Sequence, residues 1–359
     1  MSTPFQTTVR TVKHHWLTVA FFLGFITDVI LLNRVDDLID NLILLFYVLL
    51  ATTAMLLLYI GVAERAPQFM AGFLKKYSPI LMQYAFGGLL SGMLIFYGRS
   101  GDVVASAPFL LLILAVILGN EFVGKRSDKL VYNIGLYFIG LFSYVVLVVP
   151  VILGRMGDGI FILSGLITLV IITIVIQILY RIIPNFMQVN TRRIIATVGF
   201  IYIGFNALYF TNVIPPIPLS LTELEIEQSV VRLASGNYKI VSEPQVWYRQ
   251  LPLVRKEIHP TSGTIACFAR VYAPTKLQTE IFHRWEYKDA NGKWVERFRL
   301  GYTISGANTG GYRGYTQLQN FTSGIWRCSV ETERGQVLGR TTVVIDTATR
   351  PKETVTRIE

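Results

Sequence analysis

Two cysteines in the C-terminal half are residues whose chemistry depends on where the fold places them. Cys267 alternates with Ile265 and Val271, and Cys328 follows Trp326 in a second alternating run. Alternation puts each cysteine on the inward face of a strand. An Ig-like sandwich joins its sheets by a disulfide with a Trp packed on it, and an oxidising compartment permits that bond. Two separate buried thiols fit the same pattern. No metal site is expected, because two cysteines without a Cys-x-x-Cys spacing or a nearby His cluster do not make a tetrahedral set.

Polar side chains inside long apolar stretches form a second group. Asp28 lies in the first such stretch, and Arg34 follows six residues later. A carboxylate inside a bilayer is costly and therefore indicates a functional site. A structural ion pair with Arg34 and a transport or proton role for Asp28 fit this placement equally well. Further intramembrane polar residues are Gln83, Asn120 and Glu121.

An aromatic and basic surface is the third candidate. His283 and Trp285 stand at i and i+2, so they share one face of a predicted strand. A glycine-rich segment, Gly301–Gly314, adds Tyr302, Tyr312 and Arg313. Aromatic and Arg-rich concave surfaces bind sugars and peptides, although the same rings could fill the core of a small β domain. No Ser–His–Asp set, paired carboxylates or phosphate-binding loop stands out, so no catalytic residue and no cofactor are predicted.

The elements that position these residues divide the chain sharply. A bilayer core is roughly 30 Å thick and needs about 20 apolar residues of helix to cross it. Residues 1–214 hold stretches of that kind, and we predict seven spans from them. The predicted spans cover residues 16–33, 42–62, 78–97, 103–120, 131–153, 159–180 and 194–214. The fourth span contains Pro108 and is the one that could instead be re-entrant.

Basic residues flank alternate loops, which predicts the orientation in the membrane. One set of segments carries most of the Lys and Arg, whereas the other loops offer Arg34, Arg99 and Arg155 accompanied by several Asp residues. The basic set comprises Arg10, Lys13, Arg65, Lys75, Lys76, Lys125, Arg126, Lys129, Arg181, Arg192 and Arg193. Short cytoplasmic loops are the ones enriched in Lys and Arg. We therefore predict a multi-pass protein of the cytoplasmic (inner) membrane, with its N-terminus inside, its C-terminal domain outside and no cleavable signal peptide.

The chain beyond the last span changes character. Residues 215–237 open with Pro215-Pro216 and Pro218, which end a helix. Thr222 with Glu225 has the form of a capping box and predicts an amphipathic helix over about 222–234. From 238 to 346 short alternating runs joined by turn signals such as Asn291-Gly292 predict an Ig-like antiparallel β sandwich. Gly301–Gly314 is predicted to be a long loop, and residues 347–359 a polar, frayed tail.

The formal net charge of +10 does not predict binding of nucleic acid. About half of it lies in residues 1–212, where positive-inside loops explain it, and the rest is spread without a basic run. Binding to a phosphate backbone would need a continuous basic stripe. The predicted partners are therefore the lipid bilayer and an envelope glycan or protein, and no oligomeric state follows from the sequence.

Several motifs together resemble known families. Phe25–Asp28 followed by Leu32–Asp36 is similar to the opening of a group of bacterial polytopic membrane proteins of unknown function, as are Gln83–Ser100 and Asn120–Phe122. The C-terminal motifs resemble the domain of unknown function 2914, and they are His283-x-Trp285, Asn291-Gly292-Lys293, Gly324–Arg327 and Gly335–Gly339. The resemblance implies a bacterial origin and this domain order, but no activity. Cys328 stands where an aliphatic residue is expected, which would make a disulfide a local feature of this chain.

Three functions from different classes are consistent with these residues. The favoured one is a membrane-anchored recognition module whose outer sandwich binds envelope glycan, peptide or protein. The second is a transporter or channel with its polar site at Asp28, although no paired halves or broken helices are visible. The third is an intramembrane enzyme that acts on a lipid-linked substrate.

Overall fold

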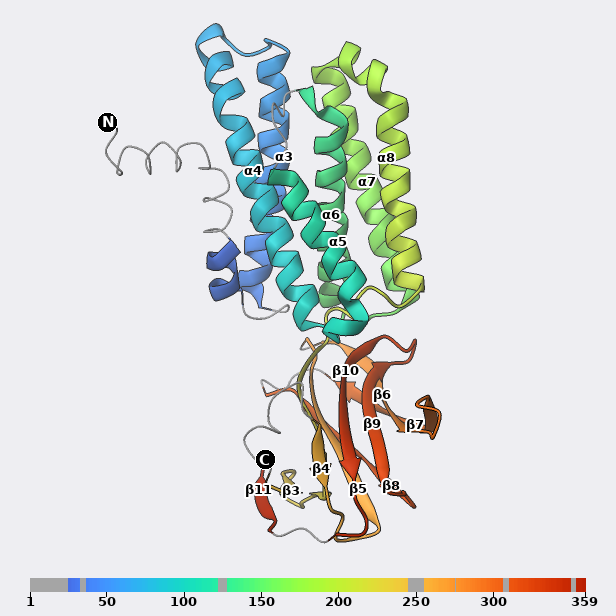
Figure 1. The fold of residues 1–359 in the computed structure, drawn as a ribbon. Helices are drawn as coiled ribbons and strands as arrows, with labels where there is room; N and C mark the ends of the chain where they lie inside the picture. Colours follow the sequence, from blue (N-terminus) through green and yellow to red (C-terminus); the bar gives the residue numbers. More distant parts are fainter. Residues whose placement is uncertain are drawn as a thin grey trace, which may run out of the picture. The chain divides into compact units, whose positions relative to one another are not determined.

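The computed structural model describes residues 25–32, 37–121, 128–244, 255–274, 276–305, 310–349 and 353–359. The chain divides into two compact units. The first comprises Met1–Gly98 and Ala107–Ile214, and the second comprises Arg99–Ser106 and Pro215–Glu359. The first unit is helical and the second is built from strands (Figure 1).

Six helices of the described chain are long and apolar enough to cross a membrane. They are α3 (Leu38–Val62), α4 (Gln68–Arg99), α5 (Val103–Glu121), α6 (Leu130–Leu153), α7 (Asp158–Ile182) and α8 (Pro184–Phe210). Residues 25–31 form a further short helical segment. Most of the first predicted span, 16–33, lies outside the described residues, so a total of seven spans stays a prediction. The fourth predicted span is a continuous helix in which Pro108 is accommodated in the second turn.

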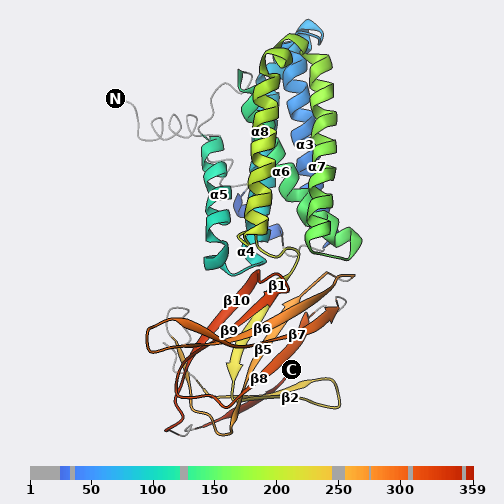
Figure 2. The same ribbon diagram turned by 90° about the vertical axis from the view of Figure 1, so that its right-hand side faces the viewer.

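Helix α6 is the best-buried helix of this unit, together with α4. It contacts α3, α7 and α8, and Figure 2 shows α7 and α8 beside it. Phe142 of α6 stacks on Phe205 of α8 with ring centroids 4.6 Å apart, and Gly140 faces the side chain of Leu89. Long apolar side chains on the outer helix faces remain exposed, as a lipid environment would require. Examples are Leu111, Val170, Ile174, Phe200 and Ile203.

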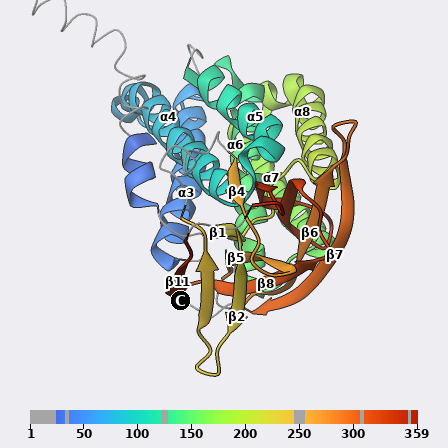
Figure 3. The ribbon, with the colours of Figure 1, turned by 60° about the horizontal axis from the view of Figure 1, so that its bottom comes forward.

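The described residues of the second unit form three sheets (Figures 1 and 3). The first has the order β1 (Ser220–Glu227), β5 (Thr264–Tyr272), β8 (Tyr312–Gln319). The second has the order β4 (Lys256–Ile258), β10 (Val337–Ile345), β9 (Gly324–Thr332), β6 (Gln278–Lys288), β7 (Trp294–Ser305). The third has the order β11 (Val355–Ile358), β3 (Tyr238–Ser242), β2 (Ser229–Arg232). Neighbouring strands are antiparallel except β4 and β10, which are parallel.

The first two sheets share one apolar core. It draws on both sheets and contains Ile226, Ile258, Ile265, Cys267, Trp285, Leu318, Trp326, Cys328, Val343 and Ile345. Of the two arrangements that the sequence left open, the structure has the disulfide, which joins Cys267 of β5 to Cys328 of β9 across Cα atoms 6.4 Å apart. The bond therefore connects the two sheets.

The helix predicted over 222–234 is wrong, because these residues form β1 and β2. Leu224 and Ile226 pack on the shared core and pair with Ala269 and Cys267 of β5. The order Glu223-Leu224-Glu225-Ile226-Glu227 alternates polar and apolar residues, which suits a strand with one buried face. Tertiary pairing therefore outweighed the local capping signal, and the β part begins at Ser220 rather than at 238.

Two further expectations about this unit need correction. The segment Gly301–Gly314 was predicted to be a long loop, but strand β7 continues to Ser305 and strand β8 begins at Tyr312. Both ends of the segment are therefore strand. The tail beyond 347 is not frayed at Val355–Ile358, which forms β11 and pairs with β3. Arg357 explains the second difference, because its guanidinium donates hydrogen bonds to the carboxylates of Glu223 and Glu225.

Candidate functional site

Strands from all three sheets line a pocket of about 350 Å³. We call it the glutamate pocket, and its lining residues are Glu225, Ile226, Glu227, Ser242, Glu243, Lys256, Ile258 and Arg357. Alternation along β1 turns Glu223, Glu225 and Glu227 to the same side of the strand. The pocket is therefore a polar concavity at one side of an otherwise apolar core.

Two cationic side chains form ion pairs with Glu225 in the glutamate pocket. The Lys256 ammonium lies 2.9 Å from Glu225 Oε1, and Arg357 Nη2 lies 3.0 Å from Glu225 Oε2. Arg357 Nη2 also donates to Glu223 Oε1 at 2.6 Å. Both oxygens of Glu225 are thus engaged by cations, which favours its charged form.

Glu227 behaves differently from its neighbour. Burial, followed by the hydrogen bond and negative charge of Glu225, raises the pKa of Glu227 from its ordinary value of 4.5 to about 8. Burial also acts on Glu225, but hydrogen bonds from Glu227 and Lys256 outweigh it and lower the pKa of that carboxyl. The pair therefore holds one proton at neutral pH, carried on Glu227 and shared with Glu225. Such a pair can donate a hydrogen bond, or release the proton to admit a cation.

The stability of the β unit is expected to fall as the pH rises from 4.5 to about 8. The folded unit keeps a proton on Glu227 that the unfolded chain releases above 4.5, so the stabilisation is complete at the acidic end and lost at the alkaline end. The lowered pKa of Glu225 acts below this range. Scanning calorimetry of the full chain in detergent measures the effect. Glu227→Gln should reduce the slope and the exposed Glu280→Gln should leave it unchanged; equal slopes in both variants would contradict the assignment.

His259 lies beside the pocket and is held by Glu243. Glu243 Oε1 lies 2.7 Å from His259 Nδ1, and Glu243 Oε2 accepts the backbone N–H of His259 at 2.9 Å. His259 Nε2 lies 3.8 Å from Glu257 Oε1 and 4.0 Å from Asp346 Oδ2. Glu257, His259 and Asp346 are close enough to one another to hold a metal ion. Sequence reasoning missed this group, although Glu257-x-His259 is a same-face strand spacing that could have indicated it.

The predicted recognition face of β6 is wrong for His283 and Trp285, because both side chains are fully buried. The inner face of β6 packs toward the first sheet, where Thr316 Oγ1 lies 3.0 Å from His283 Nδ1 and accepts the Trp285 indole N–H at 3.0 Å. The hydroxyl of Tyr302 lies 2.9 Å from His283 Nε2. Burial lowers the pKa of His283 to about 3, so the imidazole is neutral. These residues form a polar cluster inside the core rather than a ligand edge.

The other predicted contact residues are more accessible. The rings of Tyr302 and Tyr312 stack with centroids 6.2 Å apart, and both residues are partly exposed. The guanidinium of Arg313 lies 5.4 Å from the ring of Tyr238, whose hydroxyl donates to the Arg313 carbonyl at 3.1 Å. Ligand binding by Tyr302, Tyr312 and Arg313 stays a prediction.

In the helical unit, Asp28 is 2% exposed and lies against α3 and α4. Its carboxylate accepts hydrogen bonds from the hydroxyls of Tyr47, at 3.1 Å, and of Ser91. Gly88 makes room for this contact, since a Cβ there would lie 2.4 Å from the Tyr47 ring. Asp28 therefore faces other helices.

The remaining intramembrane candidates do not join this carboxylate in the described contacts. Gln83 and Asn120 are buried in α4 and α5 respectively. Arg34 lies outside the described residues, so its pairing with Asp28 stays a prediction. Glu121 is the last residue of α5, and its side chain also lies outside what the structure describes.

Comparison with known proteins identifies one domain. Residues 278–345 match the family described as Protein of unknown function (DUF2914). The match spans β6 to β10 and includes His283, Trp285 and Cys328, whereas every residue that lines the glutamate pocket lies outside it. The C-terminal part of the predicted resemblance is thereby confirmed, without an assigned activity.

Other comparisons add no functional information. No curated protein matches the chain. A solved structure, the Pseudomonas fluorescens alkylpurine DNA glycosylase AlkC bound to DNA containing an abasic site analog, aligns with 88% of this chain and 100% of its own at 10% identity. Its TM-score of 0.21 is too low to support an argument about fold or function.

Proposed function

We propose that this protein is a multi-pass protein of the cytoplasmic membrane that presents an Ig-like sandwich outside the membrane as a recognition module. The helices of membrane-spanning length and the bias of basic residues between alternate loops support the location. Two sheets that share a core, with a Trp beside a disulfide between them, support the Ig-like description. Seven spans, including 16–33, are part of the proposal.

The glutamate pocket is the binding site in this proposal, and its charge balance is the observation that carries it. Three carboxyl groups, those of Glu225, Glu227 and Glu243, face two cations, Lys256 and Arg357. When Glu227 releases its proton, the three carboxylates exceed the two cations by one charge, and a ligand ammonium group would take the place of that proton. The favoured ligand is therefore an amine-bearing peptide, glycan or protein segment of the cell envelope.

A lysine-containing peptide is expected to bind the full chain in detergent more tightly than its acetyl-lysine twin. Acetylation removes the charge, and a hydrogen bond to a charged group contributes about 1.5–3 kcal/mol, so the difference should be about tenfold or more. Calorimetric titration measures both affinities.

Variants locate the interaction in the pocket. Glu225→Gln should weaken binding of the lysine peptide. Glu280→Gln should leave this binding unchanged, because Glu280 is an exposed residue of β6 outside the pocket. Equal affinities for the two peptides, or equal losses in the two variants, would show that the pocket does not recognise an ammonium group.

The membrane topology is tested separately. A reporter that works only in the cytoplasm, fused after Glu359, is expected to be silent, and one that works only outside is expected to be active. The same pair of reporters fused after Arg65 should give the opposite result, since this loop belongs to the basic set. A bright cytoplasmic signal after Glu359 would overturn the proposed location.

Transport is the second candidate function. It is favoured by the buried carboxylate of Asp28 and its two hydroxyl donors, Tyr47 and Ser91, because intramembrane carboxylates line proton and ion paths. Reconstituted vesicles loaded with a pH-sensitive dye test it. Proton flux that depends on the chain and disappears in Asp28→Asn would favour this function over recognition alone.

A further inference from the structure

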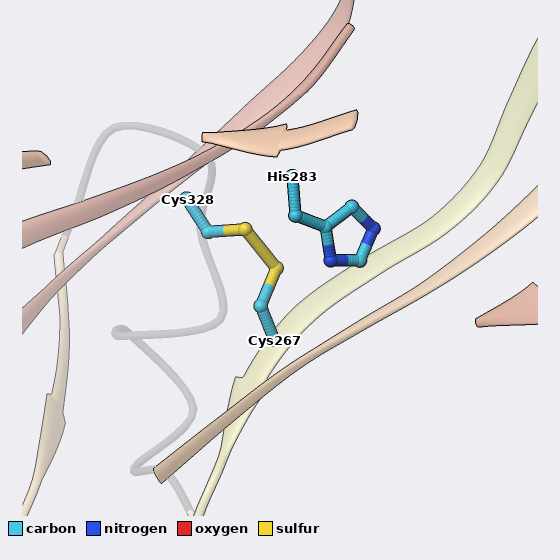
Figure 4. A group of neighbouring side chains, drawn as sticks. All are labelled: Cys267, His283 and Cys328. Atoms are coloured by element: carbon cyan, nitrogen blue, oxygen red, sulfur yellow. A yellow bond between two sulfur atoms is a disulfide. The ribbon is translucent and has the colours of Figure 1, made fainter. Parts of the chain in front are cut away.

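Three potential metal ligands meet inside the core of the β unit. Cys267 comes from β5, His283 from β6 and Cys328 from β9, and all three are fully buried. Their ligating atoms, the two sulfurs and a ring nitrogen, all lie within 4.8 Å of one another. Figure 4 shows the imidazole ring of His283 beside the disulfide.

Strand register and one side-chain contact bring these residues together in addition to the disulfide. Cys328 pairs with Trp285 across β9 and β6, and Cys267 pairs with Thr316 across β5 and β8. Thr316 in turn contacts a ring nitrogen of His283. The ladders therefore place Cys328 beside the strand of His283 in one sheet and Cys267 beside Thr316 in the other, and the contact between His283 and Thr316 links the two sheets without the bond between the sulfurs.

The imidazole is also oriented as a metal ligand would be. One ring nitrogen lies 3.0 Å from the Thr316 hydroxyl, and the other lies 2.9 Å from the Tyr302 hydroxyl. Whichever nitrogen binds a metal, the other keeps a hydroxyl that fixes the ring. Such an outer partner is a regular feature of His ligands in metal sites.

We infer that Cys267, Cys328 and His283 form a redox-gated site for a borderline divalent ion of the zinc class. Two thiolates and an imidazole are ligands that Zn²⁺ prefers, and three protein ligands leave a fourth position beside the hydroxyls of Thr316 and Tyr302. The disulfide is the closed form of the site. The pairing of cysteines alone gave no reason to expect a metal, and it is His283 that changes the chemistry.

The site opens when a dithiol reductant reduces the disulfide. The reductant transfers two electrons and two protons to the Cys267–Cys328 bond and becomes a disulfide itself. The metal ion then displaces the two thiol protons, which pass to solvent, and forms two metal–sulfur bonds and one metal–nitrogen bond. Exchange with a disulfide oxidant restores the Cys267–Cys328 bond and releases the metal ion, and the oxidant takes up the two electrons from the thiolates and two protons from solvent to become a dithiol.

The test uses the full chain synthesised in detergent under reducing conditions, so that the disulfide never forms, with Co²⁺ as the probe. The reduced chain should bind equimolar Co²⁺ with a thiolate-to-cobalt charge-transfer band that Zn²⁺ removes, and the oxidised chain should show no such band. X-ray absorption of the cobalt-loaded wild type should report sulfur and nitrogen ligands directly, without any variant. His283→Gln should weaken binding by about tenfold or more.

His259→Gln is the matched control, because it alters the other potential metal group, Glu257, His259 and Asp346. It should leave the charge-transfer band unchanged. A folded, reduced chain with two titratable thiols and no such band would overturn the inference, as would an equal Co²⁺ affinity of the wild type and His283→Gln. A reduced chain that does not fold would overturn it too, because the site requires the two sheets to pack without the disulfide.

Discussion

Trp285→Ala is expected to destabilise the β unit by about 3–5 kcal/mol. The indole is fully buried in the core that the two sheets share, and its N–H donates to Thr316 Oγ1 at 3.0 Å. Truncation would remove the ring from the core that also contains the disulfide and leave a cavity there. Hydrogen exchange of β5, β6 and β9 in the full chain, followed by mass spectrometry, measures the loss as faster opening of these strands.

Trp294 is the matched control for this prediction. It begins β7, is partly exposed and lies 4.1 Å from the guanidinium of Arg327. An exposed cation–π contact contributes about 0.5–1 kcal/mol, so Trp294→Ala should change exchange only slightly. Equal effects of the two substitutions would mean that Trp285 does not anchor the core.

Asp28→Ala is expected to destabilise the helical unit by about 1–3 kcal/mol, because it leaves two buried hydroxyls without their acceptor. Those hydroxyls belong to Tyr47 and Ser91, and Asp28 itself is 2% exposed. Asp28→Asn should cost less, since the amide oxygen can still accept one of the two hydrogen bonds. Thermal unfolding of the full chain in detergent, with Tyr47→Phe as the second arm of a double-mutant cycle, measures the coupling.

The size of that coupling decides what the contact does. Hydrogen bonds between membrane helices couple by about 0.6 kcal/mol on average and about 1.7 at most. A value in this range would identify the Asp28–Tyr47 contact as part of the helix packing. Additive losses would show that Asp28 and Tyr47 stabilise the unit independently.

The helices followed from the sequence because a bilayer imposes a length and an apolar composition on any segment that crosses it. The ends of the helices were predicted less accurately. Helix α4 begins at Gln68 and α8 at Pro184, each ten residues before the predicted span. Hydropathy detects only the apolar part, whereas the backbone hydrogen bonds of a helix continue into polar sequence.

The sequence predicted that the second unit is built from strands, but it did not predict the glutamate pocket. The inward faces predicted for Cys267, Trp326 and Cys328 were correct, because alternation along a strand reports burial directly. The glutamate pocket could not be found the same way, since its residues come from strands far apart in sequence and β1 was taken for a helix. His283 shows the reverse error: a polar side chain on an inward face was taken as a ligand contact, although hydroxyls from β7 and β8 satisfy it inside the core.

The long reach of Arg357 has a consequence for how the β unit folds. Its hydrogen bond to Glu223 joins residues 134 apart, and the disulfide joins residues 61 apart. Closing long loops costs entropy before any contact rewards it, so folds dominated by distant pairing form slowly. The core around the disulfide should therefore assemble before β11 docks. The last folding step would then be the one that completes the charged wall of the pocket, and a ligand would encounter that wall only on molecules that have finished folding.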